Sequence, residues 1–159
     1  MSRFVFNGVS HTISLLGDNE NEIGRWTAYN NIAVHDDHGG LISLRYLRNG
    51  IYNIIDRDRP HAHNSSDDSI NGGYGSYGII RFNYPGHSGI GVHSGRANRG
   101  GATFVTYGCI RTTEEAMRLI TNNIRISPLT TIDIRHNEPG DHDDPAEVGI
   151  YQPVRTYLI

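Results

Sequence analysis

Short apolar stretches separated by glycine- and asparagine-rich turns occupy the first two thirds of the chain. Their length and their β-branched and aromatic residues are typical of β-strands. They predict strands at residues 3–6, 12–16, 23–29, 41–47, 50–55, 78–84 and 89–93. The first two are expected to pair through a tight hairpin at Asn7-Gly8, and residues 41–47 are expected to pair with residues 50–55.

One helix is predicted after the last of these strands. Thr112 stands three residues before Glu115, which is the pattern of a capping box. Apolar residues then recur at helical spacing along one face, namely Ala116, Met117, Leu119, Ile120 and Ile124. Pro128 ends the helix, and residues 130–135 and 150–159 return to strand patterns. The prediction is one domain over residues 1–159, mainly β with one main helix.

Two polar segments are predicted to be loops. Residues 60–77 are rich in His, Asn, Ser, Asp and Gly, and they form a long exposed loop in this prediction. A loop of that length inside a compact domain is more often functional than not. Residues 137–147 are acidic and rich in turn formers, so we expect them to be solvated.

Composition narrows the classes of function. The net charge is −3, which gives no support to a nucleic-acid partner. All 14 basic residues are arginine, so chemistry that needs a lysine amine is excluded. No apolar run has the length of a membrane span, and the first residues do not read as a signal peptide.

The single cysteine, Cys109, has surroundings that favour catalysis over a structural role. A free cysteine is mostly protonated at neutral pH, and it becomes a nucleophile beside an imidazole or a helix N-terminus. His93 ends a predicted strand and is joined to Cys109 by a glycine-containing stretch that can fold back. The predicted helix near Thr112 is expected to point its positive end towards the sulfur.

The residues around Cys109 complete the expected site. Gly108 allows a sharp turn, so that the backbone N–H groups of Tyr107, Gly108 and Cys109 can converge on the oxygen of a tetrahedral intermediate. Arg111 is expected to bind a carboxylate through its planar fork.

The runs Gly91-Val92-His93-Ser94-Gly95 and Thr106-Tyr107-Gly108-Cys109-Ile110-Arg111 resemble the signature of L,D-transpeptidase (YkuD-type) catalytic domains. The resemblance implies a β-sandwich or open barrel with its main helix after the cysteine. It makes Cys109 the nucleophile and His93 the base, with Ser94 orienting the imidazole through its backbone carbonyl. Thr106 belongs to the same signature, and Arg111 supports the substrate pocket. The family usually has histidine where this chain has Tyr107.

The activity implied by the resemblance is attack on the stem tetrapeptides of peptidoglycan, without a cofactor. Transfer of the acyl group to an amine, a D-amino acid or water gives cross-linking, exchange or L,D-carboxypeptidase activity. Because this substrate lies outside the cytoplasm, we expect delivery to the periplasm. Small members of the family without a signal peptide resemble type VI secretion effectors, which predicts an antibacterial toxin with a secretion machinery and a periplasmic immunity protein as partners.

Three alternatives stay open from the sequence. One is a housekeeping cell-wall L,D-transpeptidase domain, and another is a papain-like peptidase, although in that class the cysteine precedes the histidine. The third is a wall-binding module with an inert Cys109. Four polar clusters could be read as metal sites, but solvated turns are the preferred interpretation and no metal is predicted: His35–His38, His61 with His63, Asp18–Glu22 and Asp141–Asp144.

Overall fold

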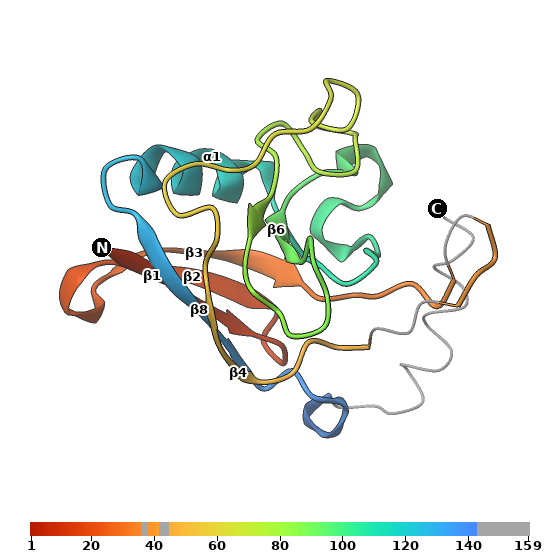
Figure 1. The fold of residues 1–159 in the computed structure, drawn as a ribbon, viewed down its shortest axis with the longest axis horizontal. Coiled ribbons are helices and arrows are strands. Elements are labelled where there is room, and N and C mark those ends of the chain that lie inside the picture. The colour runs from red at the N-terminus through yellow and green to blue at the C-terminus, as the bar shows by residue number, and fades with distance from the viewer. Residues whose placement is uncertain (36–37, 42–44, 143–159) are drawn as a thin grey trace.

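A curled sheet of eight strands and one α-helix make up the computed structural model, which describes residues 1–35, 38–41 and 45–142 (Figure 1). The strands follow the order β4-β8-β1-β2-β3-β7-β6-β5 across the sheet. Their bounds are β1 Ser2–Asn7, β2 Thr12–Leu16, β3 Glu22–Tyr29, β4 Gly50–Asn53, β5 Ile80–Arg81, β6 Gly91–His93, β7 Ile110–Thr112 and β8 Leu129–Arg135. The helix α1 spans Glu114–Ile124, and four short 3-10 turns lie at Asp18–Glu20, Ala97–Arg99, Gly101–Thr103 and Pro139–Asp141.

The two edges of the sheet meet. β4 and β5 stand at opposite ends of the strand order, yet Ile54 and Phe82, which follow them, form an antiparallel bridge. Backbone bonds on either side of it, from Ile55 N to Arg81 O at 2.8 Å and from Asn83 N to Asn53 O at 2.9 Å, continue the contact. The sheet is therefore rolled into an open barrel. The predicted mainly β fold with one main helix is confirmed.

The helix closes the core over one face of the rolled sheet. Its side chains Ala116, Met117, Ile120 and Ile124 are fully buried and pack in one cluster with the apolar side chains of the strands. Figure 1 shows α1 on one side of β1, β2 and β3. Leu119, which the periodicity placed on the same face, is 39% exposed, so the buried stripe is narrower than predicted.

The helix begins one residue later than the capping-box pattern predicts. Thr113, rather than Thr112, is the N-cap, and its hydroxyl accepts the Ala116 N–H at 3.1 Å. Thr112 is still part of β7, and its hydroxyl donates to Thr27 O at 2.7 Å. Strand pairing with β3 at the Ala28–Thr112 register therefore decides the boundary, and the predicted cap was wrong.

Other strand pairings were predicted correctly only where the two strands lie close together in the sequence. β1 and β2 pair as expected, although a four-residue turn at residues 8–11 joins them in place of a two-residue one. β4 pairs with β8 instead of with residues 41–47. Residues 45–47 form no strand, and residues 42–44 lie outside the described part of the chain, as does the predicted strand at residues 150–159. No helix among the described residues is long and apolar enough to cross a membrane.

Candidate active site

His93 and Cys109 lie on one face of two adjacent strands. β6 and β7 run parallel, with Val92 opposite Ile110 and His93 opposite Arg111. Because Val92 and Ile110 are buried in the core and side chains alternate along a strand, His93, Cys109 and Arg111 point to the other face. The strand spacing and a two-residue offset separate the Cα atoms of His93 and Cys109 by about 8 Å. Both side chains line one cavity of about 480 Å³.

The His93 imidazole is held as a neutral base. Its Nδ1 lies 2.7 Å from the carbonyl oxygen of Ser94, and a carbonyl can only accept, so Nδ1 carries the proton and Nε2 keeps its lone pair. Burial, followed by the positive charge of Arg111, lowers the pKa of His93 to about 3 against the opposing effect of the Ser94 bond. The side chain is therefore uncharged at neutral pH.

The Cys109 thiol is protonated in this state. Burial raises its pKa to about 11, while a backbone hydrogen bond from Gly91 and the charge of Arg111 act in the opposite direction. The sulfur lies 3.6 Å from Gly89 O, which accepts the S–H. Activation by the helix N-terminus, predicted from the sequence, is not available. The three residues of β7 separate Cys109 from α1 by about 10 Å, and the effect of a helix terminus fades within one turn.

Thr106 and Asn30 fix the turn before Cys109. The Thr106 hydroxyl donates to Cys109 O at 2.7 Å and accepts the Gly108 N–H at 3.1 Å. Asn30, which follows β3 and is 3% exposed, donates to the carbonyls of Gly108 and Cys109 at 3.0 and 3.1 Å. Gly108 has a φ of 147°, a conformation that other residues rarely adopt. The Gly108 N–H is thus engaged by Thr106, which removes one of the three backbone groups that the sequence offered as oxyanion donors.

Arg111 holds three loops together at the base of the cavity. Its guanidinium donates to Ser94 O at 3.3 Å, to Phe104 O and Val105 O at 2.8 and 2.9 Å, and to Gly73 O at 3.0 Å. These four bonds use both edges of the planar fork, so the fork predicted to grip a substrate carboxylate is already occupied. Within residues 1–35, 38–41 and 45–142 no carboxylate forms an ion pair with Arg111, which is 4% exposed.

The charge of Arg111 still acts on the cavity. Burial, followed by the charge of Arg96, lowers the pKa of Arg111 to about 10, and the group remains protonated at neutral pH. A buried cation without a carboxylate partner favours negative charge nearby. This effect acts on the neighbouring Cys109 sulfur and on any anionic group in the cavity.

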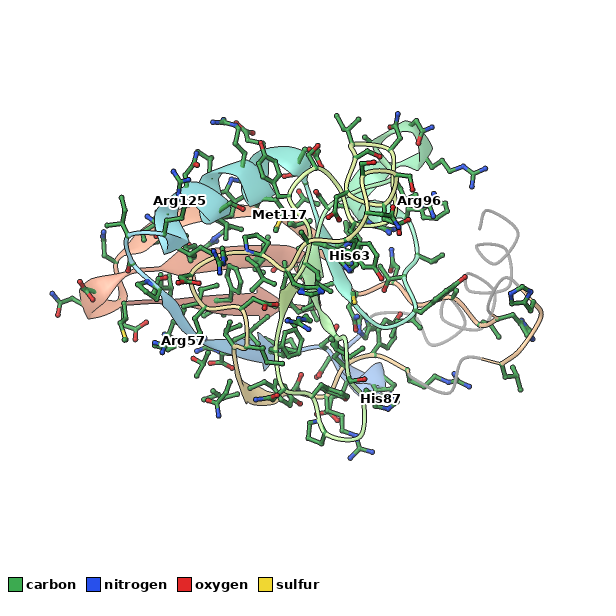
Figure 2. The ribbon with its side chains drawn as sticks, turned by 45° about the horizontal axis from the view of Figure 1, so that its top comes forward. Arg57, His63, His87, Arg96, Met117 and Arg125 are labelled. Carbon is green, nitrogen blue, oxygen red and sulfur yellow. The ribbon has the colours of Figure 1, made fainter. Side chains whose placement is uncertain are left out.

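The segment of residues 60–77, in yellow in Figure 1, is the long loop that the sequence predicted, and Asp67, Gly73 and Tyr74 in it line the cavity. Tyr74 lines the cavity, and its ring meets the His93 ring edge-on at 5.0 Å. The His63 ring stacks on Tyr74 at 3.8 Å, and its Nδ1 lies 3.0 Å from the Asp68 carboxylate. The His63 and Asp68 side chains are only 23% and 13% exposed. In Figure 2, His63 lies near the middle of the molecule, beside β6.

This segment is anchored to the strand that carries the base. Ser94 donates its hydroxyl to Glu114 of α1 at 2.6 Å, and the same carboxylate oxygen accepts the Ser76 N–H at 2.9 Å. Gly75 packs so closely on Ser94 that a Cβ atom there would collide with the Ser94 hydroxyl. Tyr74 is therefore held against His93 by contacts on both sides of the segment.

The structure gathers the predicted site residues in one place. His93, Thr106, Tyr107, Cys109 and Arg111 line the cavity, with Ser94 and Gly108 directly behind it. Sequence reasoning missed Asn30, Tyr74 and the pair His63–Asp68. The Asn-Asn pair directly after β3 and the length of residues 60–77 were the available signals. In the part of the chain that the structure describes, no three metal-binding side chains come together. Residues 36–37 and 143–144, from two of the polar clusters, lie outside that part.

Two solved structures share this fold. The crystal structure of Mycobacterium tuberculosis L,D-transpeptidase 1 superposes with a TM-score of 0.51 at 16% identity, over 84% of this chain and 61% of that one. The structure of Bdellovibrio bacteriovorus Bd1075 superposes with a TM-score of 0.58 at 18% identity, over 99% of this chain and 55% of that one. The chain thus spans between half and two thirds of the length of either structure. Among curated proteins no sequence matches it.

The family model of the L,D-transpeptidase catalytic domain (YkuD) matches residues 17–152. The match covers most of the chain, including β6, β7, the turn before Cys109 and the wall of residues 60–77. It removes the papain-like peptidase from consideration, and the order of His93 before Cys109 agrees with it. The chain belongs to the L,D-transpeptidase catalytic domain family.

Proposed function

We propose that this protein acts on peptidoglycan stem tetrapeptides through a thioester on Cys109, with His93 as the general base. One observation carries the proposal. A thiol and a neutral imidazole with its Nε2 lone pair available point from adjacent strands into the same cavity. This is the arrangement that acyl transfer by a cysteine needs.

In the proposed first step the Cys109 sulfur bonds to the carbonyl carbon of the third stem residue, and its proton passes to His93 Nε2. The bond to the terminal D-alanine nitrogen then breaks, and that nitrogen takes the proton from His93. The products are a thioester on Cys109, free D-alanine and a neutral imidazole. An amine of a second stem, a D-amino acid or water then attacks the thioester with His93 again accepting and returning the proton.

The pKa values decide when the proton moves. With Cys109 at about 11 and His93 at about 3, forming the separated thiolate and imidazolium in the free enzyme costs on the order of 10 kcal/mol. Proton transfer therefore accompanies attack, when the negative charge moves from sulfur onto the carbonyl oxygen. A backbone N–H of the turn at Cys109 is proposed to stabilise that oxygen, by about 3 kcal/mol for one donor where such sites have been dissected.

Peptide binding is proposed to use the cation and the exposed ring that border the sulfur. Arg111 supplies positive charge at the base of the cavity for a carboxylate of the stem, acting through the field and not through a bidentate fork. Tyr107, which is 45% exposed and lines the cavity, stands where the family usually has histidine. We therefore expect the substitution to alter acceptor preference and to leave the chemical step intact.

Purified tetrapeptide muropeptides test the proposal. The wild-type protein is expected to release D-alanine and to form a transient adduct of the acyl mass on Cys109, detected by intact-protein mass spectrometry. Product masses separate cross-linking, exchange and carboxypeptidase activity. The Cys109→Ala variant serves as the matched control and must be inactive. If the wild type forms neither adduct nor product, or if Cys109→Ala is as active, the proposal is wrong.

The place of action is a separate proposal. Since peptidoglycan lies outside the cytoplasm, we propose that the protein acts in the periplasm, as an antibacterial effector delivered by a secretion machinery and countered by an immunity protein. Expression directed to the periplasm should swell or lyse cells, while cytoplasmic expression and periplasmic Cys109→Ala should not. Harm that is equal in the two compartments contradicts the proposal, and growth unaffected by periplasmic expression favours a housekeeping role instead.

A further inference from the structure

A second cavity, of about 510 Å³, lies beside the active site and has no part in the chemistry described above. Its walls come from residues that precede or belong to β4 and from the loop after β5. Aromatic rings and cations dominate them: Tyr46, Tyr52, Tyr84, Arg45, Arg48 and His87.

One loop forms a wall of both cavities. Tyr84 and His87 face the second cavity, while Ser88, Gly89 and Ile90 line the active site. Gly89 O accepts the Cys109 S–H. His87 and Gly89 are two residues apart in the chain, which separates them by at most about 7 Å. A substrate that extends beyond the reacting peptide therefore needs to cross only this loop to enter the second cavity.

The rings of the second cavity are held in place before any ligand arrives. The Tyr52 hydroxyl donates to Arg48 O at 2.7 Å, and the Tyr84 hydroxyl accepts the Arg48 N–H at 3.1 Å. The Tyr52 and Tyr84 ring centroids are 5.2 Å apart, and those of Tyr84 and His87 are 6.0 Å apart. Rigid aromatic side chains of this kind offer apolar faces at low entropic cost and suit the flat faces of sugar rings.

The charge of the second cavity selects the rest of the ligand. Arg45 and Arg48 carry permanent positive charge in a chain whose net charge is −3. Glu138, whose charge acts on Tyr52, is hydrogen-bonded to the Asn49 N–H at 3.3 Å. Aromatic faces together with guanidinium groups fit a ligand that combines sugar rings with carboxylates.

We propose that this second cavity binds a carboxylate-bearing sugar–peptide unit of the peptidoglycan polymer, next to the stem whose bond Cys109 attacks. The inference rests on the proposed function. It adds that the enzyme recognises the polymer at two places, the scissile peptide in the active site and a neighbouring unit in the second cavity.

A pair of double variants tests this. Arg45→Gln with Arg48→Gln removes two charges from the second cavity and keeps the length of both side chains. Arg118→Gln with Arg125→Gln removes the same charge from the exposed face of α1 and is the matched control. Figure 2 labels Arg125 at the upper left of the molecule and His87 at its bottom, so the control lies away from the cavity.

Each protein is assayed on free tetrapeptide and on intact sacculi. On free tetrapeptide we expect both double variants to match the wild type within about twofold. On sacculi we expect the cavity variant to lose roughly tenfold in kcat/KM, as two partly exposed charge contacts would give, and the control to lose nothing. No loss on sacculi, an equal loss in the control, or an equal loss on free tetrapeptide overturns the inference.

Binding separates this inference from the proposed function. The cavity and control substitutions are placed in the Cys109→Ala background, and the protein that sediments with sacculi is measured. The cavity variant is expected to sediment severalfold less than the control, even if the wild type proves inactive on every substrate. Equal sedimentation refutes the second site and leaves the proposal for Cys109 and His93 untouched. Chitin oligosaccharides, which have no carboxylate, should bind both variants equally, and a difference there would refute the assignment of the arginines to carboxylates.

Discussion

Acid should destabilise this protein through His93, whose pKa is lowered in the folded state. The folded state holds His93 at a pKa of about 3, against 6.5 for the same group in an unfolded chain. Below pH 6.5 the unfolded chain binds a proton at this residue that the folded protein refuses, so unfolding becomes easier. This contribution is absent above pH 6.5 and grows as the pH falls towards 3.

The magnitude follows from the two pKa values. Between about pH 7 and about pH 4.5 the unfolded state gains roughly 2.5 kcal/mol relative to the folded state from His93 alone. That is a large part of the 5–15 kcal/mol by which domains are typically stable. Other groups also respond. Burial raises the pKa of Asp56, but its hydrogen bonds and charge contact with Arg81 outweigh this and lower it, so its stabilising contribution is lost in acid.

The assay is equilibrium unfolding in urea at both pH values for the wild type and for His93→Gln. Asp56 and the remaining carboxylates are common to the two proteins, so their effect cancels in the comparison. The wild type should lose about 2.5 kcal/mol more than the variant on going to the lower pH. Parallel losses would refute the reasoning. They would mean that His93 is protonated in the folded protein, as it would be in an ion pair with a Cys109 thiolate.

Three further predictions follow from the same geometry. The rate of Cys109 alkylation by iodoacetamide should rise about tenfold per pH unit between about pH 7 and pH 9, because the thiol pKa is about 11, and a plateau near neutral pH would contradict this. Arg111→Lys should lower the free energy of unfolding by about 3 kcal/mol in a urea titration, since one ammonium cannot serve carbonyls on three loops, and a change under about 0.5 kcal/mol would disprove it. Asp68→Asn should lower kcat for acyl-enzyme formation roughly three- to tenfold with little change in KM, because it loosens the packing of His63 and Tyr74 against His93. The control variant Asp18→Asn, at an exposed position, should have no effect. An equal effect of the two variants would show that Asp68 does not position His93.

The alkylation prediction also changes how an inert module is distinguished from an enzyme. A thiolate that reacts near neutral pH would ordinarily distinguish an active-site cysteine from an inert one. With a half-buried, protonated thiol and a neutral imidazole, slow alkylation is compatible with the proposed mechanism, in which His93 takes the proton as the bond to the carbonyl forms. Detection of the acyl-enzyme is therefore the discriminating measurement.

Local patterns were readable from the sequence wherever neighbours in the chain decide the outcome. The strands at β1, β2 and β3 and the apolar face of α1 depend on alternation and helical spacing, so they were predicted nearly as they occur. The predicted helix start was wrong by one residue because Thr112 pairs with β3, a strand more than 80 residues away in the sequence. The pairing of β4 with β8 was missed for the same reason.

By itself the sequence identified the candidate catalytic residues: a histidine ahead of a single cysteine, a glycine before that cysteine and an arginine two residues after it. Only the tertiary structure decided the protonation states and hydrogen-bond partners of these residues. Burial depends on every element packed around the site, and it makes His93 neutral and keeps the Cys109 thiol protonated. The folded loops also place their carbonyl oxygens against the guanidinium of Arg111, where these oxygens accept its hydrogen bonds. Folding also places Tyr74, from the polar segment of residues 60–77, against His93. The spacing of these two residues in the sequence does not predict this contact. Desolvation and long-range contacts have no local signature, and for that reason the active site could be located from the sequence but its electrostatics could not.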